Sequence, residues 1–337
     1  MNEKLLDEIC CNAPLWNKDL EELVTRPYNY LSNNTSGKNF RTLLIKNFNE
    51  IYYHLPPDKV ELICLVAEKL HNASLIIDDI EDNSEQRRGL KTCHLVYGIA
   101  GSLNSANYAY FEALQLLIDY NKLIDRNDLR LLTIIKIFNE ELLNLHRGQG
   151  LDIYWRDYMI RVKDLIPKEI DYYNMVMNKT GGLFRLIIKL MQCYIRPEEE
   201  NIKQNEENVH FCNLLGILYQ VKDDYLNLIE TTEVSINKGT FAEDITEGKF
   251  SFPIIHGINY ELERENSSFI YNILRSKTKN PETKRKVLDY LKNESKSLDY
   301  TKDKIIEIGE LIKKKYLSDT KKFQKLIQII DKLIYGK

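Results

Sequence analysis

Residues 70–82 read LHNASLIIDDIED, an apolar stretch that ends in a run of carboxylates. Residues 214–227, LLGILYQVKDDYLN, repeat that plan. Apolar residues recur at helical spacing in both segments, which therefore predict two buried helices. Carboxylates do not lie on the core-facing side of a helix unless a partner neutralises them. A hard divalent cation with a polyanionic ligand is such a partner, so the pattern predicts diphosphate chemistry inside a helical bundle.

The rest of the sequence extends the helical pattern. Only 14 glycines and 8 prolines interrupt 337 residues, and the alternation expected for strands is not sustained. We expect an all-α protein, whose length allows one large helical domain or two smaller ones. The expected helices cover residues 58–82, 103–121, 128–158, 168–194, 208–230 and 252–264, with several more after residue 281. The expected loops are residues 32–40, 196–208 and 230–240.

Composition and charge exclude several classes of protein. A net charge of −3 offers no basic footprint for nucleic acid. There is no run of about 18 apolar residues, so we expect no transmembrane helix. The first twelve residues, MNEKLLDEICCN, resemble neither a signal peptide nor a transit sequence. The six cysteines lack zinc-binding spacing, which favours reduced thiols and a cytoplasmic protein.

The carboxylates of the first segment share a helix face. Asp78 and Asp82 are four residues apart, about 6 Å along the axis, and His71 and Ser74 continue the same stripe. The helix macrodipole disfavours negative charge at this C-terminal end, so a bound cation would resolve the conflict. The alternative is an acidic helix end exposed to solvent.

The second segment follows the same logic. Gly216, Gln220, Asp223 and Asn227 lie on one helix face, with Asp224 beside them. Two such faces turned toward one cavity would hold metal ions between them. An ordinary polar helix end is the alternative.

Several basic and glycine-containing motifs are informative mainly in combination. The pair Gly181-Gly182 inside an expected helix costs helix stability and can kink the axis, which would direct the residues before it at a ligand. Close helix packing would explain these glycines equally well, and each cation taken singly also fits an exposed surface. The motifs are GKNFR at 37–41, GQGLD at 148–152, KTGG at 179–182, Lys238, and DITEGKFSFP at 244–253.

Taken together and in this order, the motifs resemble those of the trans-prenyltransferases, the isoprenyl diphosphate synthases. The resemblance spans residues 37–256 and includes DDIED followed by Arg87-Arg88-Gly89. Asn227 stands where farnesyl diphosphate synthases usually have Asp, and this variant is similar to eukaryotic geranylgeranyl diphosphate synthases, above all the fungal ones. Gly239 and Thr240 separate Lys238 from Phe241, where related sequences often have a single residue.

The resemblance implies a single large all-α bundle of the isoprenoid synthase type over residues 1–337, with a central cavity. It also implies a homodimer, with residues 1–25 as an arm or helix at the dimer interface. It implies that isopentenyl diphosphate condenses with an allylic diphosphate, farnesyl diphosphate, to give geranylgeranyl diphosphate. Three Mg²⁺ ions would stabilise the charge on the departing diphosphate.

The resemblance also assigns residues to roles. The metal ligands are Asp78, Asp82 and Asp223, and the catalytic set adds Asp79, Lys179 and Lys249. Isopentenyl diphosphate would be bound by Lys38, Arg41, His71 and Arg88. The allylic diphosphate would be bound by Arg87, Lys179, Thr180, Gln220, Lys238 and Lys249, and Asn227 is a further substrate-binding candidate.

Small residues one turn before the first acidic run predict the length of the product. Ala73 and Ser74 would leave room for growth beyond fifteen carbons. Tyr110, Phe111 and His146 are candidates for the floor that stops growth near twenty. Tyr110 and Phe111 as ordinary core aromatics, and His146 as a hydrogen-bonded core histidine, are the alternatives.

Two other functions use the same fold. A class I terpene cyclase shares the first acidic motif but should carry Ser or Thr where Asn227 stands and Glu where Thr231 stands. A non-catalytic helical regulatory subunit could lose its carboxylates, whereas this chain keeps both acidic sets and the basic residues.

Overall fold

The computed structural model describes residues 10, 16–34, 40–124, 128–158, 166–196, 198, 200–229, 241–264 and 267–336. Lys38 and Lys238 lie outside these residues, as does Thr231. The chain divides into two compact units. Unit 1 takes residues 1–38 and 68–115, and unit 2 takes residues 39–67 and 116–337.

Unit 1 is built from helices and one short hairpin. Its elements are α2 (Lys18–Asn34), the second part of α4 (Pro57–Glu81), β1 (Gln86–Arg87), β2 (Leu90–Lys91), α5 (Cys93–Tyr97) and the first part of α6 (Ile99–Ile124). The buried Ser105 hydroxyl of α6 accepts from the Tyr28 amide of α2 at 3.2 Å. An ion pair of 2.6 Å joins Lys69 of α4 to Glu112 of α6.

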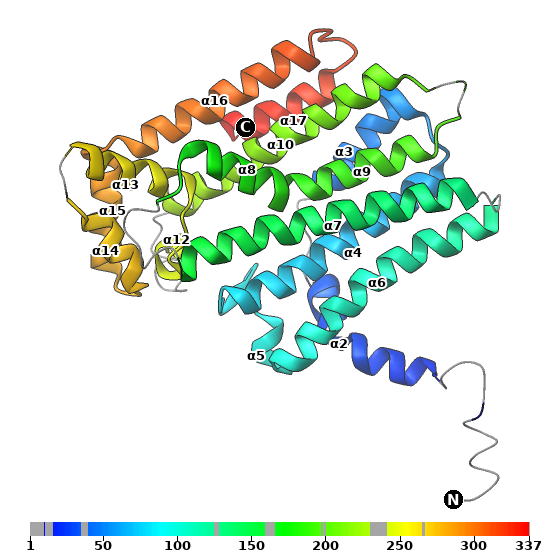
Figure 1. Cartoon of the computed structure of the whole chain (residues 1–337), viewed down its shortest axis with the longest axis horizontal. Coiled ribbons are helices and arrows are strands. Elements are labelled where there is room, and N and C mark those ends of the chain that lie inside the picture. Colours follow the sequence, from blue (N-terminus) through cyan, green and yellow to red (C-terminus); the bar gives the residue numbers. More distant parts are fainter. Residues whose placement is uncertain are drawn as a thin grey trace, which may run out of the picture. The chain divides into compact units, whose positions relative to one another are not determined.

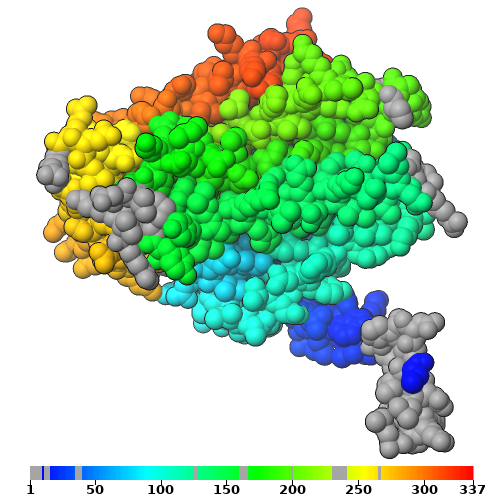
Figure 2. Space-filling view, viewed as in Figure 1, coloured from blue at the N-terminus to red at the C-terminus, as the bar shows by residue number. Residues whose placement is uncertain are grey.

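Unit 2 contains the longer run of helices. They are α3 (Phe40–Phe48), the π-helix η1 (Asn49–Tyr53), α7 (Asp128–Asp157), α8 (Glu169–Lys179), α9 (Gly181–Cys193), α10 (Ile202–Ile229), α12 (Glu243–Glu247), α13 (Phe252–Arg264), α14 (Phe269–Ser276), α15 (Pro281–Asn293), α16 (Ser297–Tyr316) and α17 (Gln324–Tyr335). Helices α7, α9, α10 and α16 lie side by side with similar axis directions (Figure 1). Their outer surfaces form successive bands on one face of unit 2 (Figure 2). The core between them includes Ile134, Phe184 and Leu215, all fully buried.

The expected all-α fold is confirmed, and most helix bounds agree with the sequence to within a few residues. The predicted 168–194 helix is divided at Thr180 into α8 and α9, where the Gly-Gly pair predicted a kink. The expectation of a loop over 196–208 was wrong for its second half. Helix α10 begins at Ile202, because the Asn201 side chain accepts from the Gln204 amide at 3.1 Å and so satisfies a donor of the first turn. Sequence reasoning also missed the hairpin.

No helix within the described ranges has both the length and the apolar character needed to cross a membrane.

Candidate active site

The first acidic cluster, Asp78, Asp79 and Asp82, lies where α4 ends. The Asp82 amide donates to the Asp78 carbonyl at 2.8 Å, so the backbone continues the helical turn one residue beyond Glu81. Asp79 is fully buried, whereas Asp78 and Asp82 are half-buried. The expected shared face of Asp78 and Asp82 therefore belongs to a formed helical turn.

The hairpin that follows neutralises the buried member of this cluster. Arg88 and Gly89 both have positive φ, as a two-residue turn of the primed type requires. Arg87, the residue before this turn, lies against the end of α4. Its Nε donates to Asp79 Oδ1 at 2.8 Å and its Nη2 lies 3.3 Å from Asp78 Oδ2. Burial disfavours the charge of Arg87, but the two carboxylates outweigh it and raise its pKa. Asp79 is thus held as one half of a buried ion pair.

The second acidic cluster is formed by Asp223, Asp224 and Asp244. Asp223 is exposed on α10, and Asp224 is buried. The Asp224 carboxylate accepts four hydrogen bonds: Tyr172 Oη at 2.6 Å, Gln220 Nε2 at 2.9 Å, the Phe252 amide at 3.0 Å and Lys249 Nζ at 3.1 Å. The buried carboxylate is therefore fully satisfied, while its exposed neighbour projects from the same helix end.

Lys249 bridges two carboxylates of the second cluster. Its Nζ lies 3.1 Å from Asp224 Oδ1 and 3.4 Å from Asp244 Oδ1. Burial disfavours the ammonium, but these two carboxylates raise its pKa well above the usual range. Burial raises the pKa of Asp244, and the charge of Lys249 opposes that rise. Lys249 is accordingly a fixed cation at the end of α10.

Lys179 and Thr180 lie at the break between α8 and α9. Lys179 Nζ forms an ion pair of 2.7 Å with Asp152 Oδ2 of the GQGLD motif. Thr180 Oγ1 donates to Gln220 Oε1 at 2.7 Å, and Gln220 in turn donates to Asp224. Four of the predicted residues of unit 2 (Lys179, Thr180, Gln220 and Lys249) thus lie in two short networks centred on Asp152 and Asp224.

Two glycines allow this break to approach its neighbours. A Cβ on Gly148 would lie 2.2 Å from the Lys179 amide nitrogen and 2.7 Å from its Cα. A Cβ on Gly216 would lie 2.8 Å from the Gly181 Cα. Backbone meets backbone at both places, so only glycine fits. For Gly181-Gly182 the sequence left a helix break and close packing as alternatives. Both apply, because the helix breaks at Thr180 and Gly216 packs against Gly181.

A buried ion cluster also contacts this break. Arg185 of α9 pairs with Glu141 of α7 through Nε and Nη2, at 3.0 and 2.8 Å to Oε2. Its Nη1 donates to the Met177 carbonyl near the end of α8 at 2.6 Å, and to Asn213 Oδ1 at 2.9 Å. Glu141 also pairs with Lys189 at 2.7 Å. Sequence reasoning missed this clamp, because an isolated Glu and Arg give no signal of a buried pair.

The remaining predicted residues are placed as follows. The Arg41 guanidinium lies 5.6 Å from the centre of the Phe184 ring. Asn227 Oδ1 accepts from the Asp244 amide at 3.2 Å, so it fastens α12 to α10. His71 is half-buried on α4, and the Ser74 hydroxyl donates to its carbonyl at 2.8 Å.

The candidate chain-length residues differ in exposure. Ala73 and Tyr110 are buried in unit 1, whereas Phe111 is 74% exposed. His146 is exposed on α7, with its Nδ1 2.8 Å from the Leu142 carbonyl oxygen, which does not fit the alternative of a core histidine. The roles of these residues in product length stay predictions.

The donor set fits magnesium better than a protein-enclosed metal. Within the part of the chain that the structure describes, no three His, Cys, Asp or Glu side chains are grouped closely enough to hold a metal ion. Mg²⁺ is usually bound by one or two carboxylates together with substrate phosphates and water. The carboxylates of Asp78, Asp82 and Asp223 are of that kind, and their role as metal ligands stays a prediction.

Comparison with known proteins decides the family. The model of the polyprenyl synthetase family matches residues 21–291, more than three quarters of the chain. This chain belongs to the polyprenyl synthetase family. The resemblance drawn from the motifs is therefore confirmed. Polyprenyl synthetases typically use Mg²⁺, in agreement with the oxygen ligands described above.

Individual relatives cover almost the whole chain. The geranylgeranyl pyrophosphate synthase of Eremothecium gossypii is 48% identical over 305 residues, which are 90% of this polyprenyl synthetase and 91% of that protein. Geranylgeranyl pyrophosphate synthase 1 of Zymoseptoria tritici is 43% identical over 302 residues, 88% and 81% of the two chains. The IDS-like terpene synthase 1 of Melampsora lini is 40% identical over 319 residues, 93% and 90% of the two chains.

Proposed function

We propose that this chain is a geranylgeranyl pyrophosphate synthase, a prenyltransferase that joins isopentenyl diphosphate to an allylic diphosphate. The observation that carries the proposal is the 48% identity to a geranylgeranyl pyrophosphate synthase over nine tenths of both chains. Farnesyl diphosphate is the allylic substrate that we propose, since one added five-carbon unit then gives the twenty-carbon product.

The metal ligands that we propose are Asp78, Asp82 and Asp223, with three Mg²⁺ ions bound when the diphosphate is present. When bound, Mg²⁺ supplies positive charge where negative charge develops on the departing diphosphate. The carboxylates beside these residues support the assignment. Asp79 pairs with Arg87, and Asp224 pairs with Lys249. In each Asp-Asp pair, the neighbour that is more exposed, Asp78 or Asp223, is therefore the one proposed to face the ions.

The cations that we propose for the allylic diphosphate are Arg87, Lys179 and Lys249, with Thr180 and Gln220 as hydrogen-bonding partners and Lys238 and Asn227 as further candidates. Lys179 and Lys249 are held by carboxylates at 2.7 and 3.1 Å. A side chain held in one position loses little entropy when it binds an anion. For isopentenyl diphosphate we propose Lys38, Arg41, His71 and Arg88.

We further propose a homodimer, a cytoplasmic location and control of product length by the residues near Asp78. Ala73 is buried and small one helical turn before the acidic cluster, which supports an open path for the growing chain. Tyr110, Phe111 and His146 are the proposed floor. Trimming them to alanine should lengthen the product, and an unchanged distribution would remove them from that role.

The test combines substrate and metal requirements. Purified protein is supplied with labelled isopentenyl diphosphate, farnesyl diphosphate and Mg²⁺, and the products are sized by chromatography. We expect a twenty-carbon diphosphate, and no turnover from Asp78→Ala although its helical circular dichroism is retained. Full activity of Asp78→Ala would count against the metal assignment. A folded wild-type protein without turnover would favour the regulatory-subunit alternative.

A terpene synthase is the second candidate, favoured by the relative from Melampsora lini. That reaction converts one prenyl diphosphate and needs no isopentenyl diphosphate. Incubation with farnesyl or geranylgeranyl diphosphate alone separates the two functions. Release of a hydrocarbon or terpene alcohol under these conditions would show the second activity, and recovery of unchanged diphosphate would exclude it.

A further inference from the structure

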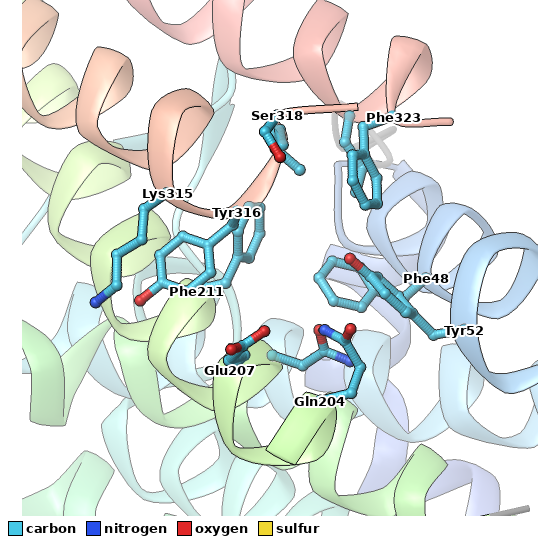
Figure 3. Close-up of a pocket in the computed structure, with 12 residues that line it drawn as sticks. Phe48, Tyr52, Gln204, Glu207, Phe211, Lys315, Tyr316, Ser318 and Phe323 are labelled. Atoms are coloured by element: carbon cyan, nitrogen blue, oxygen red, sulfur yellow. The ribbon is translucent and has the colours of Figure 1, made fainter. Parts of the chain in front are cut away.

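A cavity of about 200 Å³ lies inside unit 2, away from the acidic clusters. The end of α3, η1, the first half of α10 and the α16–α17 connection line it (Figure 3). Of the α10 residues that line it, Phe211 is the nearest in sequence to Asp223, and it precedes Asp223 by 12 positions, about 18 Å along the helix axis. The cavity is smaller than the ~300–1,000 Å³ typical of sites for drug-sized ligands, so it suits a single head group.

Aromatic rings form a continuous wall around this cavity. Neighbouring ring centres are 5.9 Å apart for Tyr316 and Phe211, 5.3 Å for Phe211 and Phe48, 5.5 Å for Phe48 and Tyr52, and 6.0 Å for Tyr52 and Phe323. Tyr52 comes from η1, and π-helical turns frequently occur at functional sites. The wall therefore combines three separate segments of the chain.

The ring faces already attract cations. The Lys322 ammonium lies 5.1 Å from the centre of the Tyr52 ring and 5.2 Å from that of Phe323. Lys315 lies 5.1 Å from the Tyr316 ring centre. These distances are within the ~6 Å over which a ring quadrupole attracts a cation. Both lysines are exposed, and Figure 3 shows the Lys315 ammonium directed away from the cavity.

The carboxylate of Glu207 supplies a negative charge at the wall of the cavity. Figure 3 shows the Glu207 carboxylate between the Phe211–Tyr316 pair and the Phe48–Tyr52 pair. Glu207 is half-buried, and it forms no ion pair or hydrogen bond with any residue that the structure describes. Burial, and after it the charge of Glu207, raise the pKa of Tyr52 to about 12. A partly desolvated carboxylate beside aromatic rings stabilises a cation and repels a phosphate or carboxylate ligand.

We propose that this cavity, the aromatic cavity, binds a small organic cation with a methylated ammonium group. Such an ion offers apolar methyl groups to the five rings and a delocalised charge to Glu207. A hydrated metal ion would not bury the rings, and an anion would meet the carboxylate. This site is separate from the condensation reaction, so its occupant need not take part in the chemistry.

Choline is the probe, and its neutral isostere 3,3-dimethylbutan-1-ol is the matched ligand control. Binding is followed by saturation-transfer difference NMR and titrated to a dissociation constant with the full chain. We expect choline to bind at least about tenfold more tightly than the alcohol, which has the same shape without the charge. Equal binding of the two compounds, or no detectable binding of choline, would overturn the proposal.

Two variants assign the binding to the cavity. Glu207→Gln should weaken choline binding about tenfold or more, while Glu206→Gln, the exposed neighbour on the same helix, should leave it unchanged. Tyr316→Leu removes one ring face and should also weaken binding. Prenyltransferase turnover of all three variants should match the wild type, which shows that they are folded. Wild-type affinity in Glu207→Gln and Tyr316→Leu would refute the assignment.

The same chemistry occurs in solutes and in lipid head groups. Sedimentation with phosphatidylcholine vesicles, compared with phosphatidylglycerol vesicles, distinguishes these sources. Competition by free choline against the phosphatidylcholine vesicles would assign a lipid head group to the cavity, whereas choline binding without vesicle binding would assign a free solute.

Discussion

Replacing Gly148 with alanine should disturb catalysis through the position of Lys179. The added Cβ would lie 2.2 Å from the Lys179 amide nitrogen and 2.8 Å from its Cβ. Ordinary contacts between such atoms are about 3.5 Å, so α7 and the end of α8 must separate by ~1 Å. A displacement of that size in a group that positions substrate costs about 100-fold in rate. We expect the variant to lose activity by about that factor in initial-rate assays with isopentenyl and farnesyl diphosphates.

Gly150, two residues later in the same helix, provides the control. A Cβ there would have nothing within 4 Å. Both substitutions gain about 1 kcal/mol of helix propensity, but only Gly148→Ala adds an overpacking cost of about 1–3 kcal/mol. Gly150→Ala should therefore keep wild-type activity and melt at the same or a higher temperature, with Gly148→Ala melting below it. Equal activities and equal melting temperatures would refute the view that glycine is needed for this approach.

Two further substitutions test the buried networks of unit 2. Tyr172→Phe removes a hydrogen bond of 2.6 Å to the Asp224 carboxylate and should lower the free energy of unfolding by about 1.5–3 kcal/mol. Thermal unfolding measures this loss, which should be smaller for the control Tyr173→Phe, because Tyr173 is less buried. Burial opposes the charge of Glu141, but Arg185 and Lys189 outweigh it and hold its pKa below the ordinary value of 4.5. The ionised clamp therefore stabilises the fold above that pH and loses its contribution as the pH falls through the folded pKa. The difference in melting temperature between wild type and Glu141→Gln should be largest at pH 7 and should disappear as the pH falls below 4.5. A difference that does not change with pH, or an equal difference for the exposed Glu140→Gln, would contradict this interpretation.

The sequence predicts those features that repeat along one helix. The 3.6-residue period of apolar side chains predicted the helices, and the spacing of Asp78 and Asp82 predicted that they share a helical turn. Both follow from the geometry of a single helix. The Gly181-Gly182 pair predicted the break at Thr180 for the same reason.

Features that depend on which helices meet could not be read from the chain. Glu141 and Arg185 are 44 positions apart, and Tyr172 and Asp224 are 52 apart. No local period connects them, and each residue alone is compatible with a solvent-exposed face. The Arg88-Gly89 turn was missed because the strands on either side have only two residues each, too few for alternation to be detected.

In the two Asp-Asp pairs, Asp78-Asp79 and Asp223-Asp224, one carboxylate is buried and its neighbour is more exposed. Asp79 and Asp224 are each 1% exposed and are paired with Arg87 and Lys249, within unit 1 and unit 2 respectively. A buried ionised carboxylate is tolerated only when it is paired and hydrogen-bonded. In the first pair this also fixes Arg87 3.3 Å from the more exposed neighbour Asp78, and in the second it fixes Lys249 on the residue that adjoins the exposed Asp223. An incoming diphosphate with its metal ions would then meet fixed positive and negative groups together, so these pairs reduce the reorganisation that binding requires. We therefore expect Asp79 and Asp224, which are paired with cations, to be as necessary to the site as the aspartates proposed to bind metal.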